Sequence, residues 1–520
     1  MLLPKVTPQS RRSFNLVRTD RFTVIAATLS LVFIFGIIAP AAAQNTTDAD
    51  QSPAQEYRIA SIEYDLTGLS RQFAIEAIVE DLYEGRVFTT EEQLAAFLAD
   101  QQQILLNERT LAEAQVEYAL SEVEPGVYDV DVTVRTRDSW NIIVLPYFRY
   151  STDDGWLLSL RLRDYNFLGT QETLGVDFDR ESDDGITDLS AGEIGISADL
   201  AWPFHRYGYD WRWLIGLDLE LDLEDEESEL EIVTGLDWSF PWLFGLDWTL
   251  GGRQSYTYFD PADPDGHLLQ SAVQLSTRVN TPWTLPAFGT ITYRPDWRVR
   301  QRYRFDGISI AAPLDRGERG PDARFRQRLS AGRVDWIGNF RRGREVSLGN
   351  IYEYNFYQAA DKGAGEGWES IRLETEIEAH ETVSAFGFSG RAGAFVDIAD
   401  SEEFSDEVRG IRERWGGRDL LDGDYGFYTN LDAGVSVIRV RPIGEVILNF
   451  FLDTGRAGSR EDGWDDMRYG GGFELFLFPL PTRAFYIRGS IGWDLEKVAD
   501  DGQLRGDGRT DIFFGLDHHY

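Results

Sequence analysis

The sequence predicts a mostly β protein, in which one small β-α-α-β-β domain is followed by a transmembrane antiparallel β-barrel. Beyond residue 139, apolar and polar residues alternate over stretches of ten or more. This is the pattern of strands with one face on lipid and the other on a wet lumen. The chain also contains 15 Trp and 13% aromatic residues, which suits the interfacial girdles of such a barrel. A soluble β-sandwich is the alternative, but its strands are shorter.

The N-terminus predicts export. Residues 1–43 have a basic start, an apolar run at 23–38 and small residues at Ala41 and Ala43, so they form a signal peptide with cleavage expected after Ala43. The polar residues 44–56 are expected to be a disordered lead. A membrane anchor and a twin-arginine signal on SRRSFNL are the alternatives.

Charge and composition exclude several classes of function. The formal net charge is −38, and nucleic acid is not expected as a partner because phosphate binding needs cationic patches. The chain has no Cys, so it has neither disulfides nor thiolate metal sites. No phosphate-binding loop, nucleophile elbow or zinc-ligand spacing occurs. We expect no enzyme activity and no cofactor.

Residues 57–138 predict the small domain. YRIASIEYDL alternates as a strand, two helical patterns follow, and AEAQVEYALSEV and VYDVDVTVRTR complete the order β-α-α-β-β. Ser70 and Thr89 are the expected helix N-caps. The closing strands are expected to leave a sheet edge that another strand can extend.

Residues 139–520 predict the barrel. One stretch, 211–221, places every second residue on an apolar face: Trp211, Trp213, Ile215, Leu217, Leu219 and Leu221. Short turns alternate with long polar loops, as in outer-membrane barrels. The pattern gives about 18 strands, and 16 lies within the error of the strand boundaries.

One long loop and one later strand carry a candidate pair. EVILNFFLDTG turns Glu445, Asn449 and Asp453 to the lumen and its apolar residues to lipid. The loop around EVRGIRERWGG holds Arg409, and on the pattern alone one of two open interpretations is that it folds into the lumen and meets Asp453. The alternative is a solvated charge run.

Three short motifs resemble those of the BamA/TamA outer-membrane protein assembly superfamily. VRGI resembles a loop motif in which an aromatic residue stands where this chain has Ile411. FLDTG resembles a strand motif of Asp followed two residues later by Gly. DYNFLGTQ resembles an early turn whose last glycine is replaced here by Gln171. The residues so matched are Val408, Arg409, Gly410, Ile411, Asp453, Gly455, Asn166, Leu168, Gly169 and Thr170. The resemblance implies that Arg409 lies at the tip of the loop and has Asp453 as its partner in the lumen.

The resemblance implies a fold and a function. Residues 57–138 would be a single POTRA domain, fewer than in BamA or TamA, and residues 139–520 a barrel of 16 strands, which makes 16 the favoured count and 18 the alternative. The protein would lie in the outer membrane of a diderm bacterium, with the POTRA domain in the periplasm. It would capture unfolded client polypeptide and insert it into, or move it across, the membrane. Outer-membrane lipid and periplasmic assembly factors are the further expected partners.

Two other functions stay open on the sequence. A passive porin-like channel of the same architecture would favour cations through an acidic lumen. A surface structural protein would act through its acidic loops. A weak cation site is a further possibility at five clustered carboxylates, for which a solvated rim is the alternative: Asp218, Glu220, Asp222, Glu229 and Glu231.

Overall fold

The computed structural model describes residues 55–151, 155–182, 192–223, 228–258, 267–306, 309–312, 320–363, 367–398, 423–440, 443–460, 463–479, 485–495 and 510–518. The predicted signal peptide, residues 44–54 of the predicted lead and the loop at 399–422 lie outside the described residues. No helix within the described ranges has both the length and the apolar character that crossing a membrane would take.

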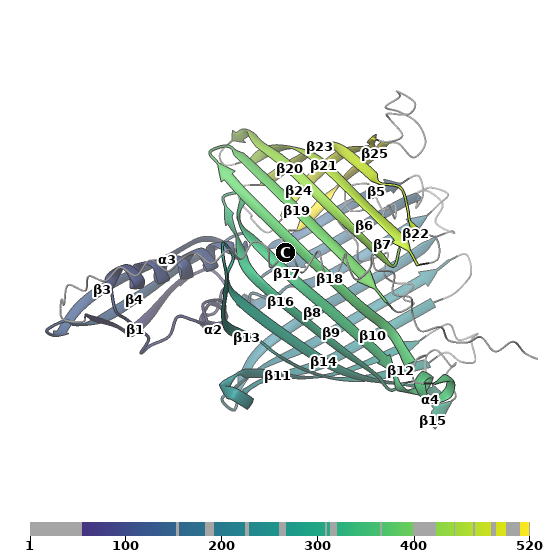
Figure 1. Cartoon of the computed structure of the whole chain (residues 1–520), viewed down its shortest axis with the longest axis horizontal. Coiled ribbons are helices and arrows are strands. Elements are labelled where there is room, and N and C mark those ends of the chain that lie inside the picture. The colour runs from purple at the N-terminus through teal and green to yellow at the C-terminus, as the bar shows by residue number, and fades with distance from the viewer. Residues whose placement is uncertain are drawn as a thin grey trace, which may run out of the picture. The chain divides into compact units, whose positions relative to one another are not determined.

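Residues 56–138, which we call the small domain, contain one sheet and two helices. The elements are β1 (Glu56–Thr67), α2 (Gln72–Ile78), β2 (Val87–Phe88), α3 (Glu91–Asn107), β3 (Leu111–Glu124) and β4 (Val127–Asp138). The strand order is β2-β1-β4-β3, with β1 parallel to β4, and α3 lies along the sheet (Figure 1). The predicted β-α-α-β-β order is present, with the two-residue β2 added between the helices.

The core of the small domain forms where the helices cover the sheet. Ile75 from α2, Leu94 and Leu105 from α3, and Val130 and Val134 from β4 are all fully buried. Burying a side chain of this size contributes about 1.5–3 kcal/mol relative to exposure. The apolar spacing of the helices and the alternation of β4 therefore fold this unit in the way the sequence predicts.

The helix starts differ from prediction in an informative way. Helix α3 is capped by Thr90, one residue after the expected Thr89, and the Thr90 side chain accepts a hydrogen bond from the Gln93 amide. Helix α2 begins after Arg71 and has no side-chain cap. The expected cap at Ser70 is wrong, because the Ser70 hydroxyl is used elsewhere.

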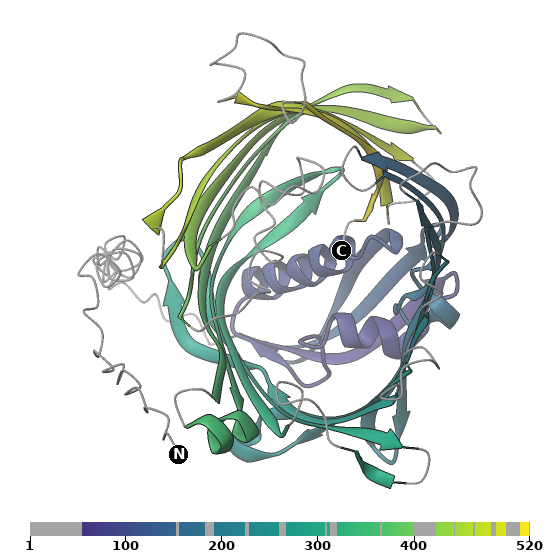
Figure 2. The same cartoon turned by 90° about the vertical axis from the view of Figure 1, so that its right-hand side faces the viewer.

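The rest of the chain closes into one barrel of twenty-one strand segments (Figure 2). Three are short: β13 (Val279–Leu285), β15 (Ser309–Ala312) and β22 (Gly463–Trp464). Each pairs with a strand that also pairs with a longer neighbour. The described wall therefore has eighteen long strands, the larger of the two predicted counts.

The eighteen wall strands run antiparallel in chain order, and the last, β25, neighbours the first, β5. They are β5 (Ile142–Ser151), β6 (Gly155–Asp164), β7 (Leu174–Ser182), β8 (Glu193–Arg206), β9 (Tyr209–Asp222), β10 (Ser228–Pro241), β11 (Asp247–Tyr258), β12 (His267–Thr277), β14 (Gly289–Asp306), β16 (Asp322–Ile337), β17 (Phe340–Asn355), β18 (Trp368–Val383), β19 (Phe386–Asp397), β20 (Tyr425–Val440), β21 (Gly444–Ser459), β23 (Arg468–Pro479), β24 (Phe485–Asp494) and β25 (Thr510–His518).

The two faces of the wall are the ones the alternation predicts. Leu217, Ile232 and Leu236 are exposed on the outer face, whereas the residues that alternate with them, such as Gly216, Asp218 and Glu231, face the lumen. The outer aromatic residues stack across strands, as Trp211 does on Trp238 at 5.6 Å between ring centroids. Such pairs add about 0.5–1.5 kcal/mol each beyond burial.

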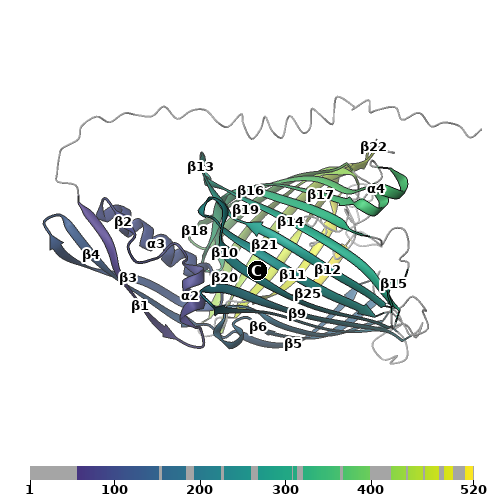
Figure 3. The same ribbon diagram turned by 90° about the horizontal axis from the view of Figure 1, so that it is seen from below.

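The two ends of the barrel differ. Tight connections such as β6–β7, with the 3-10 turn η1 (Phe167–Gly169), and β16–β17 lie at one end, which we call the near end. Helix α4 (Phe356–Lys362), β15 and β22 lie at the other end (Figure 3). The small domain joins β5 through residues 139–141 at the near end, and this connection positions the candidate site.

Candidate functional site

The β6–β7 turn holds the predicted early turn motif, and it contacts the small domain through a buried amide. Asn166 is fully buried. Its Nδ2 donates to Ser70 Oγ at 2.9 Å and to Asp138 Oδ2 at 3.2 Å, while its Oδ1 accepts from the Gln171 amide at 2.9 Å. Asp138 also accepts from the backbone amides of Leu69 and Ser70 at 2.6 and 3.0 Å. We call Ser70, Asp138, Asn166 and Gln171 the junction cluster.

Gly169 occupies a position that only glycine fits. Its φ is +78°, and a Cβ built there would lie 1.9 Å from the Leu69 carbonyl oxygen. The Gly169 carbonyl accepts from the Arg71 amide at 2.8 Å. The turn backbone therefore touches the small-domain backbone directly. This close approach, together with the positive φ, explains why the motif has glycine at this position.

The remaining motif residues shape the turn. Leu168 has φ +53° and an exposed side chain, and Thr170 Oγ1 donates to the Phe167 carbonyl at 2.8 Å. Gln171, which replaces the last glycine of the motif, also has positive φ, +60°. Its Nε2 donates to Ser70 Oγ at 2.7 Å, and its Oε1 accepts from Thr110 Oγ1. The replacement therefore adds contacts between the turn and the small domain.

A second contact joins the small domain to the β16–β17 turn. Arg109, only 1% exposed, donates from Nη1 to the Gly338 carbonyl at 2.8 Å and from Nη2 to Asn339 Oδ1 at 2.9 Å. Its guanidinium also lies 4.6 Å from the centroid of the Trp336 ring. Charge-assisted hydrogen bonds of this kind contribute about 1.5–3 kcal/mol each.

The end of helix α3 extends this second contact. Asn107 donates from Nδ2 to Asp335 Oδ1 at 2.9 Å and accepts at Oδ1 from the Trp336 amide at 3.0 Å. Asp100 pairs with Arg333 at 2.6 Å. Burial raises the pKa of the Glu108 carboxyl, which follows the helix. Two turns of the near end therefore hold the small domain by polar contacts that are largely buried.

A polar path leads from this second contact into the barrel wall. Asn339 donates from Nδ2 to Glu445 Oε2 at 2.9 Å. Farther along β21, Asn449 Nδ2 donates to Asp432 Oδ1 at 2.9 Å and to Glu474 Oε2 at 2.8 Å. The inward face of β21 thus carries a polar column that begins beneath Arg109 and consists of Glu445, Asn449 and Asp453, with the buried apolar Ile447 and Phe451 between them.

Asp453 lies on this column and is fully buried, whereas Phe450 and Leu452 beside it are exposed on the outer face. Gly455 follows on the same inward face. Val408, Arg409, Gly410 and Ile411 lie outside the described residues. The Arg409–Asp453 pair therefore stays a prediction.

The lumenal face of β14 and β16 carries a concentration of arginine. Trp297 and Val299 are exposed on the outer face, so the residues that alternate with them face inward, and the register with β16 places its even-numbered residues beside them. We call the inward set the arginine ladder: Arg294, Arg298, Arg300, Arg302, Arg324, Arg326 and Arg328.

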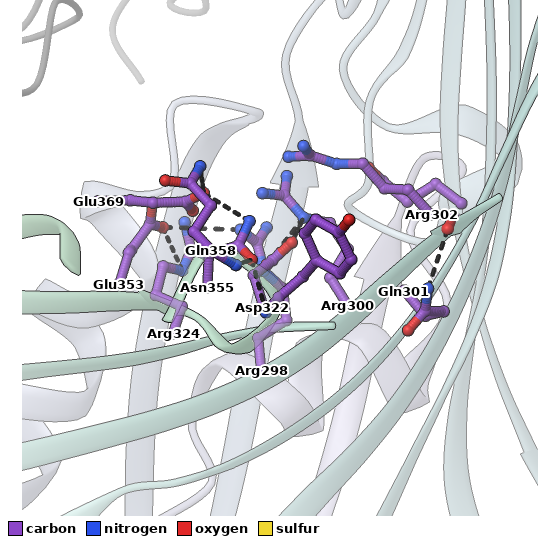
Figure 4. Close-up of polar contacts among 12 residues, drawn as sticks. Arg298, Arg300, Gln301, Arg302, Asp322, Arg324, Glu353, Asn355, Gln358 and Glu369 are labelled. Carbon is purple, nitrogen blue, oxygen red and sulfur yellow. Dashed lines mark hydrogen bonds and ion pairs between the residues drawn. The ribbon is translucent and has the colours of Figure 1, made fainter. Parts of the chain in front are cut away.

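Few carboxylates neutralise the arginine ladder. Arg300 Nε donates to both oxygens of Asp322 at 2.9 Å. Arg298 and Arg324 share Glu353, each at 3.7 Å, and Figure 4 shows this group of side chains. The Nε atoms of Arg298 and Arg324 are buried and have no hydrogen-bond partner.

The predicted acidic cluster is assembled by strand pairing, because Glu229 lies opposite Glu220, and Glu231 opposite Asp218. Among the described residues, no group of three or more acidic or histidine side chains is placed to hold a metal ion. The weak cation site is therefore not supported at this cluster.

Sequence reasoning missed several residues of this site. Arg109 looks like a helix-end arginine and Asp138 like the last residue of a strand, and neither has a motif. The sequence carried one signal for Gln171. The motif has glycine at this turn position, and a glutamine in its place indicates that the side chain makes specific contacts. The arginine ladder was also visible as RPDWRVRQR, with arginine at every second residue from Arg298.

Comparisons with known proteins give structural likeness only. No protein-family model and no curated protein matches the sequence. Similar solved structures include CdiB from Acinetobacter baumannii, with a TM-score of 0.42 and 12% identity over 88% of this chain and 73% of that chain. CdiB from Escherichia coli has a TM-score of 0.39 and 12% identity over 96% and 98% of the two chains.

BamA from Haemophilus ducreyi lacking POTRA domains 1–3 has a TM-score of 0.37 and 10% identity over 88% of this chain and 84% of that chain. With TM-scores below 0.5, these similarities carry no argument about function.

Proposed function

We propose that this chain is an outer-membrane protein assembly or translocation factor. It receives unfolded client polypeptide at the small domain, which acts as a POTRA domain in the periplasm, and inserts it into the membrane or moves it across. The observation that carries this proposal is the buried polar attachment of a small, strand-edged domain to the near end of a wide barrel. A barrel that served only as a pore would have no use for this attachment.

The small domain offers a strand edge for capture. Within the described residues, β3 pairs only with β4, so its other side presents backbone donors and acceptors. An extended client can add to such an edge, with main-chain hydrogen bonds supplying affinity. Leu120 and Val123, near the end of β3, are exposed and offer apolar contacts to the added strand.

No chemistry is needed once the client has been captured. A client strand that enters the bilayer buries apolar side chains and must close its backbone hydrogen bonds, and both processes favour completion. We propose that the contacts of Asn166 and Arg109 hold the capture edge at a fixed place beside the wall, and that Arg409 meets Asp453 to hold the long loop within the lumen.

A photo-crosslinking experiment tests capture at the edge. Ala119 on β3 and Asp131 on β4 lie directly opposite each other in the sheet, but only Ala119 is on the edge strand. A crosslinking amino acid at position 119 is expected to capture outer-membrane or secreted polypeptides in cells, and one at position 131 is the matched control. Equal capture at both positions would argue against strand addition.

Depletion followed by proteomics tests the function as a whole. Loss of several barrel proteins from the outer membrane would identify a general insertase. Loss of one or two large proteins from the medium would identify a dedicated secretion transporter. An unchanged composition of both fractions would contradict the assembly proposal and favour the passive channel or the surface structural protein.

A further inference from the structure

The arginine ladder differs in charge from the rest of this chain. The formal net charge is −38, yet seven guanidiniums lie on the inward faces of two adjacent strands. The carboxylates on the inward faces of β14, β16 and β17 are fewer: Asp296, Asp322, Glu345 and Glu353, with Glu374 of β18 beside Gly349. One of these, Asp296, accepts a hydrogen bond from Gln274. The ladder therefore carries more positive charge than the carboxylates on its own strands and on β17 neutralise.

Particular atoms of the ladder lack partners. Within the part of the chain that the structure describes, Arg302 hydrogen-bonds through its side chain only to Gln270, at 3.3 Å, and Arg326 makes no ion pair. Buried N–H groups without acceptors, as at the Nε of Arg298 and Arg324, are uncommon in folded proteins and call for a physical explanation. An anion bound along this wall would supply the acceptors.

The spacing of the ladder indicates what kind of anion it accepts. Alternate residues on a strand are about 6.6 Å apart, so Arg294 to Arg302 spans about 26 Å along β14. A small anion would use one or two of these guanidiniums. An extended polypeptide repeats its own alternate side chains at the same interval, and carboxylates match the guanidinium fork.

The barrel itself shows what such a polypeptide looks like. Its own strands carry carboxylates at every second position, as in Glu374, Glu376 and Glu378 of β18. Any barrel strand with an acidic lumenal face would present this pattern while still unpaired. In addition, β14 and β16 are the ninth and tenth of the eighteen wall strands counted from β5, so the ladder lies across the lumen from the junction of β5 with β25.

We propose that the arginine ladder binds an extended polypeptide segment with carboxylates at alternate positions. In cells this segment belongs to the client, an identification that rests on the proposed function. The ladder holds the acidic face of the client strand through ion pairs along β14 and β16, while the opposite, apolar face of the strand stays free.

The test uses the full-length protein in detergent and a fluorescent twelve-residue peptide that alternates Glu and Thr. Wild-type protein is expected to bind it with an affinity that falls as salt rises, because the contacts are ionic. A Gln–Thr peptide is expected not to bind. The double variant Arg302→Gln/Arg326→Gln should weaken binding at least about tenfold, the equivalent of one lost charge-assisted contact.

Two control variants separate an effect of the ladder from a general effect of charge or of misfolding. Arg206→Gln/Arg342→Gln removes the same charge from the near end, outside the ladder, and should leave the affinity within about twofold. Arg302→Lys/Arg326→Lys keeps the charge and should restore most of the binding, which separates loss of charge from misfolding. Equal loss in the ladder variant and in the near-end variant would overturn the proposal.

Competition identifies the ligand class. Inorganic phosphate or a lipid phosphate that displaced the peptide at equal charge concentration would show a general anion site and overturn the polypeptide assignment. This binding experiment is independent of depletion proteomics. If the peptide binds and no client is lost on depletion, the proposed function fails while the binding site stands. If clients are lost on depletion but the peptide does not bind, the proposed function stands and only the binding site on the ladder is overturned.

Discussion

Arg109 of the small domain and Asn339 of the β16–β17 turn are joined by a hydrogen bond of 2.9 Å from Nη2 to Oδ1. The same Asn339 side chain donates to Glu445 on the inner face of β21. The side-chain amide of Asn339 thus connects a buried guanidinium of the small domain with a carboxylate of the barrel wall. Its oxygen accepts from the guanidinium, and its nitrogen donates to the carboxylate. The position of the small domain is therefore set by the barrel residues themselves.

Replacing Arg109 with Ala should loosen this attachment. The change removes two charge-assisted hydrogen bonds and the contact with Trp336, and it leaves Asn339 and Gly338 without their donor. We expect a loss of about 3 kcal/mol in local stability, or about 100-fold faster hydrogen exchange at amides 338–340.

Arg58→Ala is the control for this prediction. Arg58 pairs with Asp129 on the surface of the same domain, and its side chain is 48% exposed. An exposed pair contributes little to stability, so exchange in the β16–β17 turn should not change. Normal exchange in the Arg109 variant would show that the guanidinium does not hold the turn.

Replacing Gly169 with Ala should displace the β6–β7 turn. Gly208, in the β8–β9 turn, has the same φ of +78° but no atom within 4 Å of a built Cβ, whereas at Gly169 the Leu69 carbonyl oxygen is 1.9 Å away. Both variants carry the backbone cost of a left-handed residue, about 1–2 kcal/mol. Only Gly169→Ala adds a clash with the small domain.

The difference between the two variants therefore isolates the domain contact. We expect Gly169→Ala to expose the segment around Leu69 to limited proteolysis and to lower the thermal unfolding temperature more than Gly208→Ala does. Equal shifts in both variants would show that the Gly169 contact does not attach the domain.

The sequence predicts these features unequally. Alternation determines which side of a strand faces lipid, so the inward position of Asp453 and the assembly of the acidic cluster follow from local pattern alone. The motif at Asn166–Thr170 is found by resemblance, but its role in docking is not. That role depends on Ser70 and Asp138, which lie far from it in sequence and carry no pattern.

Ser70 shows why local rules fail at such a place. A serine before a helix is normally read as a cap, but here its hydroxyl accepts from Asn166 and Gln171 and donates to Asp138. Tertiary hydrogen bonds to buried partners outweigh a cap, which contributes about 1 kcal/mol. Arg109 was missed for the same reason, because its partners come from a turn about 230 residues later in the chain.

Glu108 should make the small domain sensitive to pH. Burial raises the pKa of its carboxyl above the ordinary 4.5, so the unfolded chain ionises first as the pH rises. Stability is fully present below the ordinary pKa and is lost as the pH rises through the higher folded-state pKa. Glu108→Gln should therefore unfold at a higher temperature than wild type at pH 7 and at the same temperature near pH 4.

This difference can be followed by the loss of helical circular dichroism, to which α3 contributes. The exposed Glu84, replaced by Gln, is the control and should shift neither temperature. A Glu108→Gln variant that is no more stable at pH 7 than at pH 4, relative to wild type, would contradict an unfavourable buried charge.

Asn449 should be essential to the polar column of β21. Its single Nδ2 donates to both Asp432 and Glu474, so its two N–H bonds point at two carboxylates and reduce the repulsion between them. Asn449→Asp keeps the size of the side chain but replaces these donors with a third carboxylate in a buried place. Since a buried charge without a partner costs about 3–5 kcal/mol, the variant barrel should lose its heat-resistant folded band on gels at a lower urea concentration. Asn280→Asp, an exposed change of the same kind on β13, should leave that concentration unchanged, and an equal response of the two variants would mean that Asn449 does not stabilise the column.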